Sequence, residues 1–392
     1  MGLVLLFHLP AQGQAKKQRL LSGDRDWTHM VVCFPECILV DEDHQVEVVD
    51  LKSRRSTLSQ WQFPDSVCKA LGKGQGNTVL FVDKKRQVWS CQKGVAPIQV
   101  GTAPDAVRGL LQLSSGEVVL VLAKGVQVGF GTGLIEFPSK EDDQPAKRVV
   151  NLGETGATDS IPKLEQGFLS DGRTEMHADR LGRLWIGKNK GEWGGDLLCL
   201  DLKTRTWQGF DYSRFSVDRN PVKGFLEYGH SFWVLTGCSH MGIRHGTICQ
   251  LQGRSWVPVL ETERFYKYRE RKFIGKGWEI GPACVLEKDG TLILATDEGL
   301  RKAPLKALPT DPDAWKSILR FPKLYPMRDP DADPKKNKDE DEEENLSEEE
   351  EEDLDNPFEV VQLEALPNGH VLWMTANHGL GIWNGRRVRL IR

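Results

Sequence analysis

The sequence lacks the short motifs that identify many enzymes and metal-binding proteins. It has no Cys-x-x-Cys pair, no Gly-x-Ser-x-Gly turn and no phosphate loop ending in Gly-Lys-Ser or Gly-Lys-Thr. These absences exclude the simplest zinc-site, serine-hydrolase and nucleotide-binding interpretations. No run of 18 apolar residues occurs, so neither a membrane-spanning helix nor a membrane partner is predicted. No long segment has helical periodicity, which favours a chain built of strands.

Cysteine is present but shows no disulfide pattern. The eight cysteines are scattered, and most lie in or beside apolar runs, where a free thiol behaves as a small buried hydrophobe. We therefore expect a reducing compartment and favour the cytoplasm over a secreted or periplasmic location. The apolar run Leu3–Leu9, followed by Ala11 and Ala15, resembles a signal sequence, but it lacks a charged segment before it. A strand of the fold is the preferred interpretation.

The most informative feature is a repeated phrase in which a small or polar residue and Gly precede large apolar residues. Each copy supplies its own turn and strand, and the copies lie 40 residues or more apart. Such a repeat is the signature of a propeller or solenoid. The copies are Ser115–Leu120, Leu181–Gly187, Gly229–Val234, Asp289–Leu294 and Asn368–Met374.

A second glycine follows nine or ten residues later in three copies, at Gly125, Gly299 and Gly379. A position between the second and third strands of a hairpin sheet often needs positive φ, which glycine adopts at least cost. We therefore predict an all-β fold, a β-propeller of seven four-stranded blades, with six blades as the alternative. The single domain has predicted blades at about 27–62, 66–100, 107–138, 173–211, 221–260, 279–325 and 358–392.

Uneven spacing between the blades predicts three insertions. Two lie between blades, at 139–171 and 261–277. The third, 329–356, contains almost no apolar residues and is predicted to be disordered. From Asp329 to Asp355 there are 16 acidic residues against three lysines, a net charge of −13. The whole chain carries −4, so the remainder carries +9.

One repeat points to a known family. The segment Asp179–Gly187 reads Asp-Arg-Leu-Gly-Arg-Leu-Trp-Ile-Gly and resembles the two-component-regulator propeller repeat; looser copies follow at Asp289 and Asn368, each with a later Gly-Leu. About half of the blades share this likeness, and blades 1, 2 and 5 depart from it. The resemblance implies a propeller that senses ligands or binds partners. No kinase, receiver or DNA-binding segment is expected after the last blade.

Propellers bind ligands at the mouth of the central channel, on the loops between second and third strands. Polar and aromatic residues fall on these predicted loops or on the innermost strand of blade 4. The ligand-binding candidates are His177, Lys188, Trp193, His240, Arg244, Asn377 and His378. Asp297 and Glu298 fall on the corresponding loop of blade 6. A sugar, a peptide or an anion could bind such a mouth, although any propeller has a polar rim.

Two further clusters contain residue types that can bind a metal ion or a polyanion. Cys238, His240, His245 and Cys249 are zinc-ligand types, but their spacing matches no compact zinc site, so neither a metal nor another cofactor is predicted. The 261–277 insertion alternates basic and aromatic residues, a pattern that could bind a polyanion. Its candidates are Arg264, Lys267, Arg269, Arg271 and Lys272. A loop that packs its aromatics on a neighbouring blade is the preferred interpretation, and nucleic acid is not expected as a partner.

These observations favour a non-catalytic module that presents one face of the ring and its insertions to a protein partner or an extended ligand. The alternative is a propeller-type lyase or glycoside-acting enzyme with His177, Glu175 and His378 at the central channel. Two histidines and one glutamate are more often hydrogen-bonded structural groups than a catalytic site, so no catalytic residue is assigned.

Overall fold

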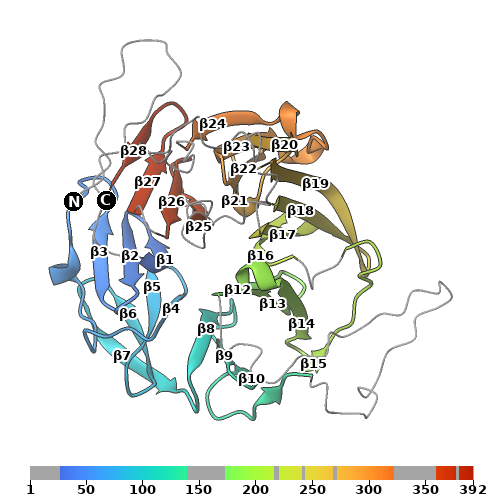
Figure 1. Cartoon of the computed structure of the whole chain (residues 1–392). Helices are drawn as coiled ribbons and strands as arrows, with labels where there is room; N and C mark the ends of the chain where they lie inside the picture. The colour runs from blue at the N-terminus through green and yellow to red at the C-terminus, as the bar shows by residue number, and fades with distance from the viewer. Residues whose placement is uncertain are drawn as a thin grey trace, which may run out of the picture.

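The chain is a ring of seven β-sheets. The computed structural model describes residues 27–138, 173–215, 220–240, 243–267, 272–321, 359–376 and 379–391. In these residues the strands form seven antiparallel sheets around one axis (Figure 1). The protein is therefore an all-β, seven-bladed β-propeller, with seven blades and not six. Leu3–Leu9 and the predicted insertions 139–171 and 329–356 lie outside the described residues.

The first three blades occupy residues 27–136. Blade 1 contains β1 (Trp27–Cys33), β2 (Glu36–Asp41) and β3 (Val46–Asp50); blade 2 contains β4 (Ala70–Lys73), β5 (Thr78–Val82), β6 (Gln87–Gln92) and β7 (Val95–Thr102); blade 3 contains β8 (Val107–Gln112), β9 (Val118–Leu122), β10 (Gly125–Val128) and β11 (Ile135–Glu136). Blade 1 thus has three strands, and the expectation of four is wrong. Residues 52–56 are all polar or charged, and their β-pairing is limited to the isolated bridge Val49–Ser56. The short helix η1 (Leu58–Gln60) follows.

The other four blades follow the same order of strands. Blade 4 contains β12 (Arg173–Ala178), β13 (Arg183–Asn189), β14 (Gly195–Asp201) and β15 (Thr206–Trp207), with η2 (Gly191–Trp193) between β13 and β14; blade 5 contains β16 (Val222–Tyr228), β17 (Ser231–His240), β18 (Ile243–Gln252), β19 (Ser255–Lys267) and β20 (Lys272–Lys276); blade 6 contains β21 (Ile280–Leu286), β22 (Thr291–Thr296), β23 (Gly299–Pro304), η4 (Leu305–Ala307), η5 (Pro312–Ala314) and β24 (Lys316–Arg320); blade 7 contains β25 (Val360–Ala365), β26 (Val371–Thr375), β27 (Gly379–Trp383) and β28 (Val388–Leu390).

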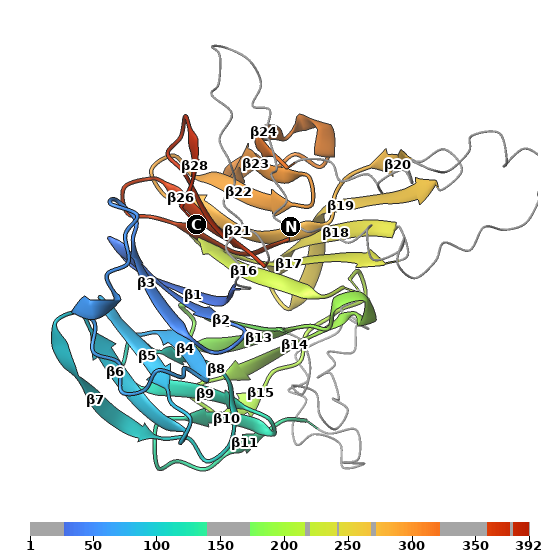
Figure 2. The ribbon, with the colours of Figure 1, turned by 60° about the vertical axis from the view of Figure 1, so that its left-hand side comes forward.

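The 261–277 segment differs from its prediction as an insertion between blades. It completes β19, which is 13 residues long, and then returns as β20, the fifth strand of blade 5. Its alternating basic and aromatic residues suit a two-sided strand as well as a loop, because successive side chains point to opposite faces. Figure 2 shows β17, β18 and β19 projecting beyond the other blades on one side of the ring.

The repeated turn owes its shape to an aspartate as well as to glycine. Asp179 accepts hydrogen bonds from the backbone N–H groups of Leu181 and Arg183, at 2.9 and 3.0 Å, while Gly182 adopts φ of 76°. The other carboxylate oxygen of Asp179 accepts from Nε of Arg183 and Nε1 of Trp185, at 2.7 and 2.8 Å. The phrase therefore closes a hairpin and fixes a core tryptophan at the same time.

The second glycine of the repeat has two different reasons for being there. Gly299 and Gly379 have φ of 134° and 85°, as predicted for these turns. Gly125 does not have positive φ, so that expectation is wrong for blade 3. A Cβ atom at Gly125 would lie 2.3 Å from the carbonyl oxygen of Ile135. Close approach of the neighbouring strand, and not backbone strain, requires glycine there.

The hydrophobic core is divided among the junctions between blades. In the described residues, each of seven apolar clusters joins one sheet to the next around the ring. One example joins Trp185 of blade 4 to Trp256 of blade 5, with ring centroids 5.3 Å apart. All eight cysteines are buried, and none forms a disulfide bond with another. Because each blade buries its faces against two neighbours, the sheets stabilise one another as a single ring.

The ring is closed by contact between the first and last blades. The innermost strand of each blade contacts that of the next, and β25 contacts β1. The side chain of Gln362 accepts from the backbone N–H of Met30 at 3.0 Å and donates to its carbonyl oxygen at 2.7 Å. Blade 7 takes all four of its strands from residues 360–390. Among the described residues, the last blade therefore has four strands of its own.

Candidate binding face

The two faces of the ring carry different loops between strands. In blades 4 and 6 the start of the innermost strand lies opposite the end of the second strand, as in the pairs Arg173–Asn189 and Ile280–Thr296. The loops between second and third strands therefore lie at the same end as the starts of the innermost strands. We call this end the upper face; it includes the loops 83–86, 123–124, 190–194 and 297–298. The turns between first and second strands, such as 179–182, lie on the opposite, lower face.

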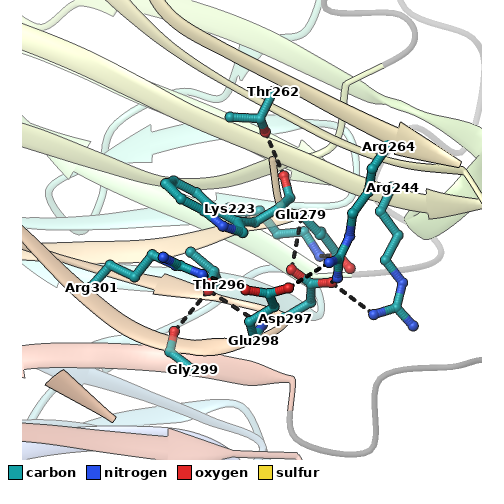
Figure 3. A network of polar contacts seen from close by, with 11 residues as sticks. Lys223, Arg244, Thr262, Arg264, Glu279, Thr296, Asp297, Glu298, Gly299 and Arg301 are labelled. Carbon is teal, nitrogen blue, oxygen red and sulfur yellow. Dashed lines mark hydrogen bonds and ion pairs between the residues drawn. The ribbon is translucent and has the colours of Figure 1, made fainter. Parts of the chain in front are cut away.

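A network of buried charges joins blades 5 and 6 at the upper face (Figure 3). Asp297 is fully buried, and its Oδ2 accepts from Nη1 of Arg244 at 2.7 Å and from Nη2 of Arg264. The Nη1 of Arg264 also donates to Oε1 of Glu298 at 2.6 Å, and Arg301 binds the other oxygen of Glu298. The network thus brings three arginines and two carboxylates together.

The network is built on backbone and aromatic contacts. Oδ1 of Asp297 accepts from the backbone N–H of Glu279 at 3.1 Å, which fixes the carboxylate from its second side. The guanidinium carbon of Arg301 lies 4.1 Å from the ring centroid of Trp278, in a cation–π arrangement. Burial tends to raise the pKa of Glu298, but Arg264 and Arg301 outweigh it and the pKa is lowered. The Glu298 carboxylate is therefore held in its charged form.

A second cluster of charges lies at the starts of the innermost strands. Nζ of Lys223, on β16, lies 3.0 Å from Oε1 of Glu279 and 2.8 Å from Oε1 of Glu359. One lysine thus joins blade 5 to blades 6 and 7. Burial alone would lower the pKa of Lys223, but the two carboxylates raise it. Lys223 lowers the pKa of Glu359. Burial raises the pKa of Glu279, and the attraction of Lys223 offsets this effect only in part.

The two residues of the alternative enzymatic site that are described do not bind each other. Glu175 pairs with Nε of Arg173 on the same strand at 2.8 Å, and burial raises its pKa. His177 lies two residues nearer to the lower face, where its Nε2 is 3.3 Å from Oε2 of Glu227 on the next blade. The His177 ring packs against Phe232, with centroids 5.5 Å apart. His177 is therefore part of a contact between blades, away from the upper face, and His378 lies outside the described residues.

The remaining ligand candidates have different environments. Lys188 is fully buried on β13, so it is not presented to a ligand at the surface. Trp193 on η2 has 79% of its surface exposed. Arg244 is on the upper face, where it binds Asp297. The side chain of His240 and the residue Asn377 are outside the described part of the chain.

The polyanion candidates are only partly described. Arg264 is buried and bound to Asp297 and Glu298, so it is engaged by carboxylates of the chain itself. The positions of Lys267 and Lys272 on β19 and β20 are described but their side chains are not, and Arg269 and Arg271 lie outside the described residues. The sequence analysis did not identify these two carboxylate partners of Arg264.

The weighed zinc ligands do not converge in the described structure. Cys238 and His245 are directly opposite on β17 and β18, but Cys249 lies in the core between blades 4 and 5. No group of three or more histidine, cysteine or acidic side chains suited to a metal ion occurs among the described residues. No helix in the described part of the chain has the length and apolar character needed to cross a membrane.

Sequence reasoning missed Lys223, Glu279, Glu359 and Arg301. One signal was available: Lys223 and Glu359 are charged residues beside the starts of apolar strands, where an unpaired charge would be costly. Their partners could not be named, because the pairs join residues as far as 136 positions apart.

Comparisons with known proteins assign no family to the chain. No family model matches the chain, and no curated protein matches it. Similar solved structures include the computationally designed protein Ika8, with 11% identity, a TM-score of 0.47 and coverage of 93% of this chain and 98% of that one. The WD40 propeller domain of Doa1 has 10% identity, a TM-score of 0.46 and coverage of 94% and 96%. YCF48 bound to D1 peptide has 9% identity, a TM-score of 0.48 and coverage of 92% and 93%.

Proposed function

We propose that this chain is a non-catalytic binding module that presents the upper face of its propeller to a protein partner or an extended ligand. The observation that carries the proposal is the buried network of Arg244, Arg264, Asp297 and Glu298. It gives the blade 5 end of this face a fixed shape, with charged groups from two blades held in place. A rigid sheet platform with recognition on its loops is the usual division of work in such folds.

The enzymatic alternative receives less support from the described residues. Glu175 and His177 are each engaged by a separate partner, Arg173 and Glu227, and they point to no shared substrate position. A general acid and base must both reach the reacting group. We therefore favour binding over catalysis.

We further propose that the ring is of the two-component-regulator repeat type. Support comes from the turn at Asp179 and Trp185, in which the aspartate and the tryptophan of the repeat are hydrogen-bonded to each other. We propose a reducing compartment, with the cytoplasm favoured, because eight buried thiols without a disulfide are expected where thiols are kept reduced.

Site-specific photo-crosslinking in cell extract tests the binding proposal. A photoreactive residue is placed at Lys190 on the upper face or, in a matched variant, at Leu181 on the lower face. We expect covalent protein adducts at Lys190 in clear excess over those at Leu181. Equal yields at both positions, or no adducts at Lys190, would contradict the proposal.

A further inference from the structure

The contact between the last blade and the first, which we call the closing junction, differs from the other contacts around the ring. The seven blades follow one another along the chain, so the chain itself connects each blade to the next. Blades 7 and 1 have no such connection, because one holds the last strands of the ring and the other holds the first. In Figure 1, β1 lies beside β25 and β26, although 332 positions separate Met30 from Gln362.

Two sets of neutral hydrogen bonds bridge the closing junction. The side-chain amide of Gln362, on β25, accepts from the backbone N–H of Met30 at 3.0 Å and donates to its carbonyl oxygen at 2.7 Å. One side chain thus pairs with both backbone groups of a residue on the innermost strand of blade 1. The backbone N–H of Trp27 also donates to the carbonyl oxygen of Ala376 at 3.3 Å. Neutral hydrogen bonds contribute modestly to stability, because water replaces them when the contact opens.

Both sides of the closing junction are held by ion pairs to their other neighbours. Nζ of Lys93, in blade 2, lies 2.8 Å from the buried carboxylate of Glu36, in blade 1. On the other side, Nζ of Lys223 binds Glu359, directly before blade 7, and Glu279, directly before blade 6. Hydrogen bonds between charged groups are stronger than those between neutral groups. Blade 1 is therefore fixed to blade 2, and blade 7 is fixed to blades 5 and 6.

Apolar packing supplies the rest of the closing junction. Trp27, Met30 and Cys37 of blade 1 belong to one cluster with Leu372 and Met374 of blade 7. Burial of these side chains favours the closed ring. At any other junction the connecting chain limits how far two blades can separate, but at the closing junction nothing tethers them directly. The gain in conformational entropy on opening is therefore largest there.

We propose that the ring opens reversibly at the closing junction, with the side chain of Gln362 as the latch that holds it shut. In the open state blade 1 moves away from blade 7 while it remains packed on blade 2, and the apolar cluster that contains Cys37 is uncovered. The ring can thus change its width at one place without unfolding a blade. This inference does not depend on the binding function proposed above.

Buried cysteines at three junctions report opening in the unmodified protein. Cys37 lies at the closing junction, Cys91 between blades 1 and 2, and Cys249 between blades 4 and 5, and all three are fully buried. Burial raises the pKa of each thiol, so none reacts while its junction is closed. The native full chain is treated with N-ethylmaleimide, and labelling of each cysteine is followed by mass spectrometry. Cys37 should react at least about tenfold faster than Cys91 and Cys249, because local opening needs less free energy than unfolding of the ring.

Gln362→Met tests the latch, because it removes both hydrogen bonds to Met30 and keeps the length of the side chain. Labelling of Cys37 should accelerate about fivefold or more, as the loss of two hydrogen bonds predicts. Labelling of Cys249 should change less than about twofold, because the two sites share no contacts. Circular dichroism verifies that the variant is folded.

Gln75→Met is the matched control at a junction that the chain connects. The side-chain amide of Gln75, in blade 2, donates to the carbonyl oxygens of Leu113 and Ser114, in blade 3, at 2.8 and 2.9 Å. This variant therefore also loses two hydrogen bonds between blades. It should leave the labelling of Cys37 within about twofold of the wild type, since the two junctions are separate.

Two results would overturn the inference. The first is equal labelling of the three cysteines in the wild type, or no labelling of any, because the closing junction would then open no more readily than the others. The second is equal acceleration of Cys37 labelling by Gln362→Met and by Gln75→Met. If Gln362→Met does not fold, the comparison of the three cysteines in the wild type decides. Neither result affects the crosslinking at Lys190 that tests the binding function.

Discussion

The carboxylate of Asp297 accepts a 2.7 Å hydrogen bond from Nη1 of Arg244, although the two residues are 53 positions apart in the sequence. Arg244 belongs to blade 5, and Asp297 follows the second strand of blade 6. The same carboxylate oxygen binds Arg264, and the other accepts from the backbone of Glu279. One buried aspartate thus fixes the relative positions of two blades at the upper face.

Asp297→Asn should destabilise the protein by about 3–5 kcal/mol, because it leaves two buried arginines without their shared counter-charge. Urea denaturation followed by tryptophan fluorescence measures the loss. Asp313→Asn is the control: its ion pair with Lys276 is exposed on both sides, at 64% and 68%, and such pairs contribute about 1 kcal/mol or less. Equal effects of the two substitutions would contradict this role for Asp297.

Lys223→Met should destabilise the protein more at pH 8 than at pH 5. Without the lysine, the carboxylates of Glu279 and Glu359 lose their shared counter-charge. The pKa of Glu279 should then rise further above the ordinary value of 4.5, and the pKa of Glu359 should rise from its lowered value. A carboxyl whose pKa is raised by folding opposes folding increasingly as pH rises above that ordinary value. We expect a loss of about 3 kcal/mol at pH 8 and clearly less at pH 5. A loss independent of pH would be evidence against the charge cluster.

Glu36 should make the opposite contribution to pH dependence. Its buried carboxylate accepts from Oγ1 of Thr57 at 2.7 Å, Nε1 of Trp61 at 3.0 Å and Nζ of Lys93 at 2.8 Å. Burial acts to raise its pKa, but these partners lower it below the ordinary 4.5. The stabilisation is therefore present above pH 4.5 and is lost as pH falls through the lower folded value.

Comparison of the wild type with Glu36→Gln measures this contribution. The difference in the free energy of unfolding should be about 1–3 kcal/mol at pH 7 and should shrink towards pH 3. Denaturant titrations at both pH values provide the measurement. A difference that grows on acidification would show that the sign of the pKa shift is wrong.

Gly237→Ala should destabilise the junction of blades 5 and 6. A Cβ atom at Gly237 would lie 1.9 Å from the carbonyl oxygen of Ile280, and backbone atoms cannot yield as a flexible side chain can. We expect a loss of about 3 kcal/mol or more, at the upper end for overpacked sites. Gly133→Ala is the control, since no atom of the described residues lies within 4 Å of its added Cβ. Thermal unfolding of both variants should separate them, and similar melting temperatures would contradict the close approach.

The propeller could be predicted from the sequence, but the blades that depart from four strands could not. Turn glycines such as Gly182 and Gly290 fix a local backbone shape, so their repetition revealed the blades directly. The long β19–β20 hairpin was mistaken for an insertion, because a strand longer than its neighbours breaks the repeat without a local signal.

In the candidate site, the positions of residues within a blade could be predicted, but their contacts with other blades could not. Loop position predicted that Arg244, Asp297 and Glu298 would lie on the upper face, since it follows from the order of strands within a blade. Pairing between blades could not be predicted: Lys223 and Glu359 meet only because blades 5, 6 and 7 curve around one axis. His177 lies on the innermost strand of blade 4, as predicted, but near the lower end of that strand, because each residue along a strand moves further from the upper face.

Hydrogen–deuterium exchange of the full chain, with and without its crosslinked partner, tests the central claim most directly. Binding at the upper face predicts slower exchange in the loops 190–194 and 297–298, and unchanged exchange in the lower-face turns 179–182 and 287–290. Slower exchange confined to the lower-face turns would contradict the account.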